Sequence, residues 1–344
     1  MTSTKNSEKG RKPKKNAAHI QFGFEFQSNA AIVLMLKNIK SAEFVKVEGE
    51  YEDIEITLDS GKKFYSQVKA VFDPEDTSNL NKKLKDALKS MNDVPDTEPI
   101  EQLIYVTNSP NPFNEERTMF AFSSGYNFYK LDKLPKLCED KIIKLCDDND
   151  FKLDKSKLSV CVIQFHGDGE NKFKVIKETI NEFLNSIGEG DRGIGQEMLE
   201  GWQRAFSLNA SESDTKVTIG KKDMIWSIIA RICRLSKEEA ENAGCDEGEL
   251  DEITRKYEDI MKNKTECFEF VTKVISEYNG YKTEISSKER QKQFIKSKWR
   301  QFKDDFACDS LDKDLLPKLI QLIISNVLRS RFRISDIKKE VNLK

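Results

Sequence analysis

The chain has 344 residues, of which 34% are charged and 38% are hydrophobic, and its 57 basic residues nearly balance its 59 acidic ones. This balance excludes a protein coated in basic charge, so any contact with nucleic acid is expected to be local. No apolar run is long enough to span a bilayer, no secretory segment follows the start, and the seven cysteines never take CxxC spacing, which together favour a cytoplasmic protein with reduced thiols.

The first forty residues combine a basic tail with a helix. Residues 1–18 are rich in lysine and lack apolar periodicity, which is typical of a disordered segment. Two interpretations stay open for this tail: a solvated terminus, or a non-specific grip on nucleic-acid phosphates. From residue 22 to residue 40 apolar side chains recur at helical spacing, so a helix with a broad buried stripe is predicted.

Residues 44–70 are predicted to form one short strand and then a hairpin. Apolar and polar residues alternate along both arms, which is the pattern of half-buried strands. A three-residue loop that ends with Gly61 in the left-handed conformation sets Asp53 directly across from Gln67 and leaves Lys69 diagonally beside both. The apolar side chains then share the opposite face, so the hydrophobic pattern and the turn chemistry agree on one register.

An acidic residue, a second oxygen ligand and a lysine on one sheet face indicate metal-dependent phosphodiester hydrolysis. Asp53 and the Gln67 side-chain carbonyl, with the backbone carbonyl of Val68, offer the hard oxygen ligands that Mg²⁺ or Mn²⁺ prefers. Such an ion polarises a phosphodiester and activates water, while Lys69 orients that water or stabilises the developing negative charge. The alternative interpretation is an edge hairpin that carries charged residues on its solvated face.

An acidic cluster precedes Asp53, and its spacing singles out no extra ligand. Glu48, at the end of the first strand, is favoured as an accessory acid, followed by Glu50, and Glu52 completes the cluster. The alternative is that these acids are surface charge.

A lysine-rich helix and two further strands follow the hairpin. One face of the helix is apolar, and its other face would track a duplex backbone or form a solvated surface. The lysines of that second face are Lys82, Lys83, Lys85 and Lys89. Residues 103–106 begin a buried strand, and residues 158–165 are predicted to add an edge strand to the same sheet.

The rest of the chain is predicted to be almost wholly helical. Its last helix, around residues 312–331, is apolar over most of its circumference and needs cover from its own domain or from another subunit. The expected organisation is a basic tail (1–19), an α/β domain with a mixed central sheet (20–170) and a mostly α-helical domain (171–344).

The helix start that contains Gln27, the acidic cluster and Gln67-Val68-Lys69 resemble the PD-(D/E)XK nuclease fold, in the variant where glutamine replaces the second acid. More narrowly, they look like the CD-NTase-associated double-stranded DNA endonucleases, and the helical second half is closest to the nuclease subunit of Lamassu anti-phage systems. The order helix, three strands, helix, strand is the core order of that fold. The resemblance implies a restriction-endonuclease-like α/β (α+β) core. It also sets Gln27 where some relatives carry a metal-binding glutamate, with capping of a neighbouring strand as the alternative.

The resemblance further implies a Mg²⁺-dependent endonuclease that hydrolyses double-stranded DNA as the effector of a bacterial anti-phage defence system. The implied partners are an SMC-like ATPase and a small accessory subunit of the same operon, which hold the enzyme inactive until release, and active relatives often self-assemble into homo-oligomers. Two other classes stay open on the same residues: a module that binds nucleic acid or partner proteins without cutting, and an RNase toxin.

Overall fold

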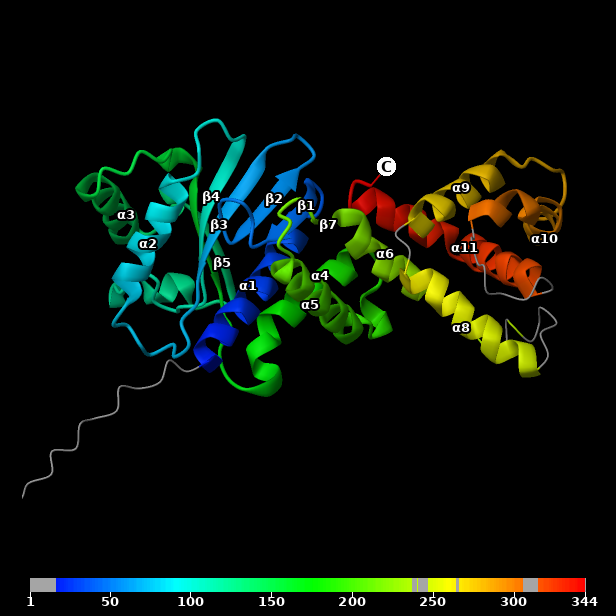
Figure 1. Cartoon of the computed structure of the whole chain (residues 1–344), viewed down its shortest axis with the longest axis horizontal. Helices are drawn as coiled ribbons and strands as arrows, with labels where there is room; N and C mark the ends of the chain where they lie inside the picture. Colours follow the sequence, from blue (N-terminus) through cyan, green and yellow to red (C-terminus); the bar gives the residue numbers. More distant parts are fainter. Residues whose placement is uncertain (1–16, 237–239, 241–246, 264–265, 306–314, 344) are drawn as a thin grey trace, which may run out of the picture. The chain divides into compact units, whose positions relative to one another are not determined.

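The computed structural model describes residues 17–236, 240, 247–263, 266–305 and 315–343, so the predicted tail up to residue 16 lies outside the described residues (Figure 1). By its contacts the chain divides into two compact units. The first comprises Met1–Met35, Val45–Glu178 and Gln203–Thr218, and the second comprises Leu36–Phe44, Thr179–Trp202 and Ile219–Lys344. Each unit is therefore assembled from three separate stretches of sequence. No helix in the described ranges is long and apolar enough to cross a membrane.

The predicted mixed sheet is confirmed, and it has seven strands in the order β5-β6-β4-β3-β2-β1-β7. The strands are β1 Ala42–Val47, β2 Ile54–Leu58, β3 Lys63–Lys69, β4 Ile100–Thr107, β5 Tyr126–Lys130, β6 Leu158–Ile163 and β7 Ile219–Gly220. β3 pairs in parallel with β4 and β4 with β6, whereas β2 and β5 run antiparallel to β3 and β6. The carboxyl ends of β3, β4 and β6 therefore meet at one edge of the sheet.

The order of the elements from α1 to β4 matches the sequence prediction. The part of the sheet beyond β4 does not. Helix α1 (Ala17–Lys37) precedes β1 to β3, and α2 (Leu80–Asn92) separates β3 from β4, so the order helix, three strands, helix, strand is confirmed. Strand β5 and helix α3 (Lys136–Asp148) were not predicted. Because β5 pairs with β6 on the side away from β4, the prediction of an edge strand at residues 158–165 was wrong. All six residues of β6 are buried, as an internal strand requires.

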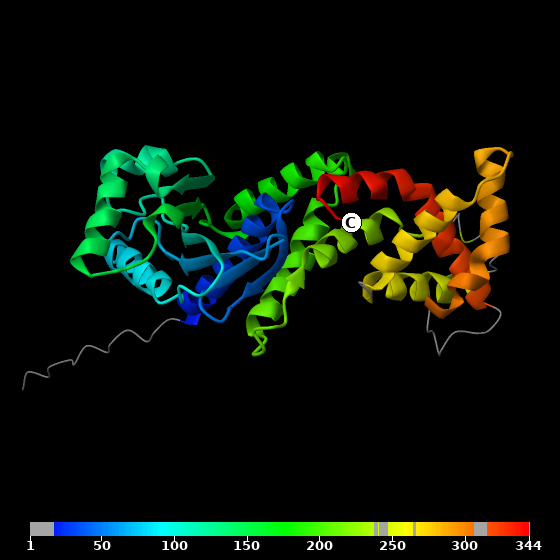
Figure 2. The ribbon, with the colours of Figure 1, turned by 90° about the horizontal axis from the view of Figure 1, so that it is seen from above.

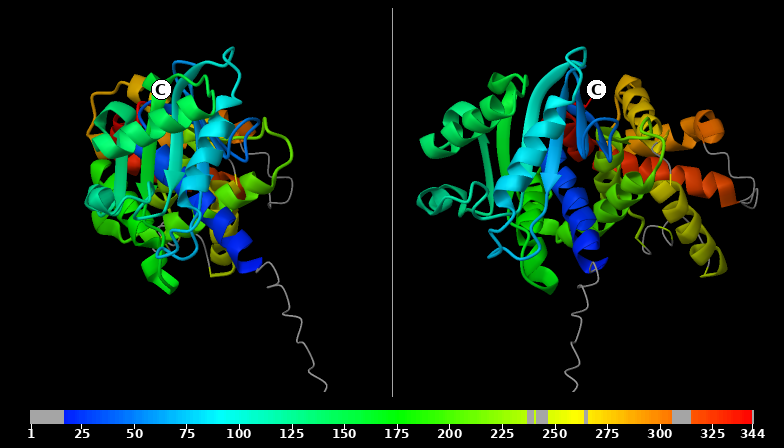
Figure 3. Two further views of the ribbon diagram at one scale, coloured as in Figure 1. Left: turned by 90° about the vertical axis from the view of Figure 1, so that its left-hand side faces the viewer. Right: turned by 60° about the vertical axis from the view of Figure 1, so that its left-hand side comes forward.

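Helices cover both faces of this sheet within the first unit. Figures 1 and 3 show α2 and α3 against one face and α1 against the other. Tyr65, Leu103 and Tyr105 pack with Leu84 and Leu88 of α2 in the core on the first face. Gln67 shares the face of Tyr65 by strand alternation and is only 5% exposed. The alternative of an edge hairpin with a solvated polar face was therefore wrong, because β3 is internal and α2 covers that face.

The predicted helical C-terminal region is confirmed in the second unit, where α11 (Leu315–Glu340) contacts α8, α9, α10 and the 3₁₀ helix η6 (Figure 2). The remaining helices in the described ranges are α4 Lys174–Ser186, α5 Gly195–Ser211, α6 Lys221–Ile232, α8 Glu247–Asn263, α9 Glu266–Gly280 and α10 Ser287–Lys298. The 3₁₀ helices are η1 Glu116–Phe122, η2 Leu131–Lys133, η3 Lys155–Lys157, η4 Gly169–Phe173, η5 Gly190–Arg192 and η6 Trp299–Asp305. The nearly all-round apolar surface of α11 is thus covered from within its own unit.

Two buried lysines bind backbone carbonyls near helix ends, one in each unit. In the first unit, Lys46 Nζ donates to the carbonyl oxygens of Asn209 (2.7 Å) and Glu212 (3.1 Å) at the end of α5. In the second unit, Lys221 Nζ donates to the carbonyl oxygens of Lys40 and Val341, both at 3.1 Å. A cation at a helix carboxyl end satisfies unpaired carbonyls and complements the helix dipole.

Candidate functional site

The hairpin register predicted from the sequence is confirmed. Ile54 pairs with Ser66, so the next pair toward the open end of the hairpin is Asp53 and Gln67. The loop closes through a hydrogen bond from the Leu58 amide to the Lys62 carbonyl (2.8 Å), and Gly61 has a φ of 79°. Glycine adopts this left-handed conformation without steric cost, so the turn residue fixes which side chains meet at the site.

Two donors from β3 converge on one carboxylate oxygen of Asp53. The Val68 amide donates to Asp53 Oδ2 at 2.7 Å, and the Gln67 side-chain amide donates to the same oxygen. Burial raises the pKa of Asp53, against the opposing effects of the Val68 amide, the nearby Lys69 ammonium and the Gln67 amide. Lys69 is therefore close enough to Asp53 to act on its charge, as the register predicted.

Glu52 is the site residue that sequence reasoning did not favour. It is only 4% exposed, and its Oε2 accepts a hydrogen bond from Ser90 Oγ of α2 (3.2 Å). Its Oε1 is buried and has no hydrogen-bond partner among the residues that the structure describes. Burial and the charge of Asp53 raise the pKa of Glu52 to about 8, and Lys69 opposes that rise. Strand alternation assigns neighbouring residues to opposite faces, so the only sequence signal was its place directly before Asp53.

The turn before β2 explains the position of Glu52. Buried Glu55 accepts hydrogen bonds from the amides of Tyr51 (2.7 Å) and Glu52 (3.3 Å). A Cβ on Gly49 would lie 2.5 Å from Cδ of Glu55, so the turn needs glycine for this close approach. Residues 49–52 are thus folded around one carboxylate.

The two acids favoured from the sequence differ in their surroundings. Glu48 has a φ of 55°, its amide donates to the Asp53 carbonyl (2.8 Å), and its charge raises the pKa of Asp53. Glu50 is exposed. Its charge helps to raise the pKa of Tyr51, although burial is the chief cause of that rise. The charge of Glu48 therefore acts on Asp53 more strongly than the charge of Glu50 does.

Side chains from β4 and α2 hold the backbone around Lys69. Thr107 Oγ1 donates to the Lys69 carbonyl at 2.8 Å, and Lys83 Nζ donates to the carbonyl of Ala70. The buried Asn108 side chain accepts from the Val71 amide (2.7 Å) and donates to the Val71 carbonyl (2.8 Å), as a neighbouring strand would. This arrangement fixes the main chain that carries the predicted catalytic lysine.

The four lysines predicted to bind DNA do not form one group. Lys82, Lys85 and Lys89 are exposed on α2, whereas Lys83 is half-buried against the end of β3. Burial lowers the pKa of Lys83, and the neighbouring Lys69 charge acts in the same direction. Lys83 thus belongs to the surroundings of Lys69, and the exposed stripe has three members.

Gln27 takes the capping contact that was its alternative role. Its Nε2 donates to the backbone carbonyl of Asp53 at 2.9 Å, and the side chain is buried. The contact fixes the main chain at the start of β2. It uses the side-chain nitrogen, so only the side-chain oxygen of Gln27 could bind a metal ion.

The donor set fits a hard divalent cation only in part. Within the described residues, no three His, Cys, Asp or Glu side chains are grouped so as to hold a metal ion. Asp53, the unpartnered oxygen of Glu52 and the Gln67 amide oxygen are the oxygen-type ligands that Mg²⁺ prefers. Rotation of the Gln67 amide by half a turn would present its oxygen in place of its NH₂ group. Substrate phosphate oxygens are the natural source of the remaining ligands.

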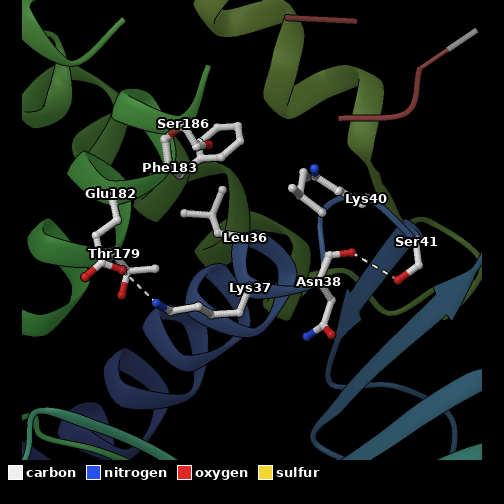
Figure 4. Close-up of a pocket in the computed structure, with 10 residues that line it drawn as sticks. Leu36, Lys37, Asn38, Lys40, Ser41, Thr179, Glu182, Phe183 and Ser186 are labelled. Atoms are coloured by element: carbon white, nitrogen blue, oxygen red, sulfur yellow. Dashed lines mark hydrogen bonds and ion pairs between the residues drawn. The ribbon is translucent and has the colours of Figure 1, made fainter. Parts of the chain in front are cut away.

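A concave surface of about 370 Å³ lies elsewhere, in the second unit, at the end of α1 and along α4 (Figure 4). Two of its charged lining residues, Lys37 and Glu182, pair at 2.7 Å, and Ser41 Oγ donates to the Asn38 carbonyl at 3.3 Å. None of the predicted site residues lines it.

Comparisons with known proteins do not name a family. No protein-family model and no curated protein matches the chain. Two solved structures of the Acinetobacter baumannii Cap4 SAVED/CARF-domain containing receptor, with the cyclic trinucleotides 2'3'3'-cAAA and 3'3'3'-cAAA, match with TM-scores of 0.36 and 0.37. Both matches have 16% identity and cover 61% of this chain but only 44% of the receptor, less than half its length. A likeness this low assigns neither ligand nor activity.

Proposed function

We propose that this protein is a metal-dependent DNA endonuclease of the restriction-endonuclease-like class and the effector of a bacterial anti-phage defence system. The observation that carries the proposal is the meeting of Asp53, Gln67 and Lys69 at the adjoining ends of β2 and β3, with Glu52 buried beside Asp53. The order α1, β1 to β3, α2, β4 supports it, because the PD-(D/E)XK nucleases that the sequence resembles share this core order.

Each residue of the site has a role that its surroundings support. Asp53, Glu52, the Gln67 amide oxygen and the Val68 carbonyl would hold Mg²⁺ or Mn²⁺. When bound, such an ion supplies a Lewis acid for the phosphodiester and makes a bound water more acidic. Lys69 stabilises the negative charge that develops on the phosphate, and because Thr107 and Asn108 fix the adjoining main chain, little reorganisation is needed.

The biological setting of the proposal rests on the sequence resemblance alone. Duplex DNA is the substrate, and an SMC-like ATPase with a small accessory subunit holds the enzyme inactive until release. Assembly into a homo-oligomer accompanies activation. The dependence of cleavage on the partners tests the inhibition. Its dependence on protein concentration tests the assembly, and the two are measured separately.

The test is degradation of plasmid DNA and of RNA by the purified full chain with Mg²⁺ or Mn²⁺, alone and with its operon partners. The site variant is Lys69→Ala, and the matched control is Lys62→Ala, because Lys62 lies exposed at the far end of the same hairpin. Cleavage of DNA by the wild type and the control, but not by Lys69→Ala, supports the proposal. Cleavage of RNA only would identify an RNase, and no Lys69-dependent cleavage with partners present would exclude a nuclease.

A second candidate is a nuclease-like module that binds without cutting. The Gln67 amide favours it, because it offers NH₂ to Asp53 where a metal needs an oxygen. The lack of a three-ligand group among the described residues points the same way. Metal-independent binding of DNA, with no cleavage in the presence of partners, would establish this module.

A further inference from the structure

Helix α10 (Ser287–Lys298) carries far more positive charge than its packing requires. Five of its twelve residues are cationic against one acid, Glu289. The exposed Arg300 follows two positions after the last residue of the helix. The cationic residues of the helix are Lys288, Arg290, Lys292, Lys296 and Lys298. Because the whole chain has a formal net charge of −2, this is a strong local concentration of charge.

Helix α10 has one fully buried side chain, Phe294, in contact with the rest of its unit. Phe294 packs against Tyr278 and Tyr281, with ring centroids 5.3 and 5.5 Å apart. It is the one buried residue of α10. Lys292 and Lys296 each lie two positions from Phe294, about 200° around the helix, so they project on the opposite side.

Three lysines form a regular row on this outer side. Lys288, Lys292 and Lys296 are all exposed and recur every four residues, a rise of about 6 Å per step. Within the described residues, no ion pair joins any of the three to a carboxylate. By contrast, Arg290 is engaged: it donates to the Tyr278 carbonyl (2.7 Å) and lies 4.4 Å from the centre of the Tyr278 ring.

Helix stability does not explain the row. Lys296 and Lys298 stand in the last turn, where cations complement the helix dipole. Lys288 stands in the first turn, where a cation opposes the dipole. The one acid of the helix, Glu289, stands beside it, and its backbone amide donates to Ser286 Oγ (3.3 Å). The helix dipole therefore accounts for the cations of the last turn but not for Lys288 in the first.

The chemistry of the row selects one kind of partner. Protein interfaces need an apolar or aromatic centre that is desolvated on contact, and the outer face of α10 has lysines and glutamine there instead. Membrane-surface helices need an apolar face to insert, but the two apolar residues of α10, Phe294 and Ile295, are buried and half-buried in its unit. Evenly spaced exposed cations match the regular anionic backbone of a nucleic-acid duplex.

We propose that Lys288, Lys292 and Lys296, with Arg300, form a surface that binds the phosphate backbone of duplex DNA. It is separate from the α2 lysines of the first unit and reads no base sequence, because phosphate contacts position a protein without specifying bases. The surface has the same ligand as the proposed nuclease, but it binds whether or not the chain cuts.

The experiment is fluorescence anisotropy of a labelled duplex of about 30 base pairs, titrated with the full chain in EDTA over a series of salt concentrations. The test variant replaces Lys288, Lys292 and Lys296 with glutamine, which has a similar helix propensity. A rescue variant replaces the same three with arginine. The matched control replaces Lys136, Lys152 and Lys174 with glutamine, since each is exposed and already paired with a neighbouring carboxylate.

We expect the test variant to lose roughly tenfold or more in affinity at about 0.1 M salt, and the slope of log K against log salt to fall by up to about 2.7, near 0.9 per lost phosphate contact. The rescue and control variants keep the wild-type values. Wild-type affinity and slope in the test variant would overturn the proposal and leave an acidic protein as the partner of α10. Equal losses in test and control would also overturn it, as a simple effect of net charge. Because EDTA prevents metal-dependent cleavage, neither result depends on the nuclease.

Discussion

Asp53 and Gln67 face each other across β2 and β3, and the Gln67 amide donates a hydrogen bond to the Asp53 carboxylate. A carboxylate at position 67 would place a like charge against Asp53, whose pKa burial already raises. Glutamine therefore lets the metal-free site fold with a satisfied acid. The same amide weakens the site as a metal centre, because its neutral oxygen is a poorer ligand than a second carboxylate.

Gln67→Glu is expected to lower the stability of the metal-free protein and to raise its affinity for a metal ion. In EDTA at pH 7.5 the variant should lose about 1 to 3 kcal/mol of unfolding free energy, because a hydrogen bond is replaced by charge repulsion. Mg²⁺ or Mn²⁺ should restore more stability to the variant than to the wild type, since ligand binding to the folded state adds stability by mass action. Thermal melting with and without metal measures both effects. Equal metal responses in the two proteins would contradict the assignment of position 67 as a ligand.

Glu52→Gln is expected to flatten the dependence of stability on pH. The folded protein holds the Glu52 proton up to about pH 8, whereas the unfolded chain loses it near the ordinary value of 4.5. Between these values the folded state binds more protons, so the unfolding free energy of the wild type should fall as pH rises, by up to about 1.4 kcal/mol per pH unit. Urea unfolding from pH 5 to pH 8 compares the two proteins. Parallel curves would show that Glu52 is ionised at neutral pH in the folded protein.

Lys46→Met is expected to destabilise the first unit by about 1 to 3 kcal/mol, because it leaves the carbonyls of Asn209 and Glu212 without their donor. Chemical denaturation followed by circular dichroism measures the loss. The control is Lys62→Met, which removes a surface ion pair to Glu101 and should change stability by less than about 1 kcal/mol. Similar small effects of both changes would mean that water satisfies the carbonyls of α5.

Gly49→Ala is expected to disturb the turn that places Glu52. The added methyl would collide with the Glu55 side chain and displace the carboxylate that holds the Tyr51 and Glu52 amides. A loss of about 1 to 3 kcal/mol is expected. Gly23→Ala is the matched control, because its methyl meets no atom within 4 Å and alanine should stabilise α1 by up to about 1 kcal/mol. Differential scanning calorimetry separates the opposite signs, and stabilisation by both changes would refute the turn argument.

The hairpin could be read from the sequence because two independent signals agreed. Alternation assigned each residue to a face, and Gly61 fixed the loop length that brings Asp53 opposite Gln67. Burial of that face could not be read in the same way, since it depends on α2 packing across strands far apart in sequence. The sequence assigned Gln67 to the polar face of the hairpin, and its polar neighbours gave no sign of the helix that covers this face.

The elements that escaped prediction had weak or overlooked local signals. Helix α3 buries Cys138, Ile142 and Cys146, a spacing of four that helical periodicity would have found. Strand β5 mixes two polar residues into five and becomes a strand only by pairing with β6. Glu52 was missed for a different reason: a turn held by Glu55, which no period describes, turns it toward Ser90.

The contact between Lys46 and Asn209 also determines how early the first unit can finish folding during translation, because the two residues are 163 positions apart in the sequence. At elongation rates of roughly 5 to 20 residues per second, the ribosome needs about 8 to 33 s after Lys46 to add Asn209. Until then the nascent first unit lacks Gln203–Thr218, and the ammonium of Lys46 has no helix end to bind. The amino-terminal unit therefore cannot complete its fold early in translation, and nascent-chain arrest before residue 203 should leave it open to protease.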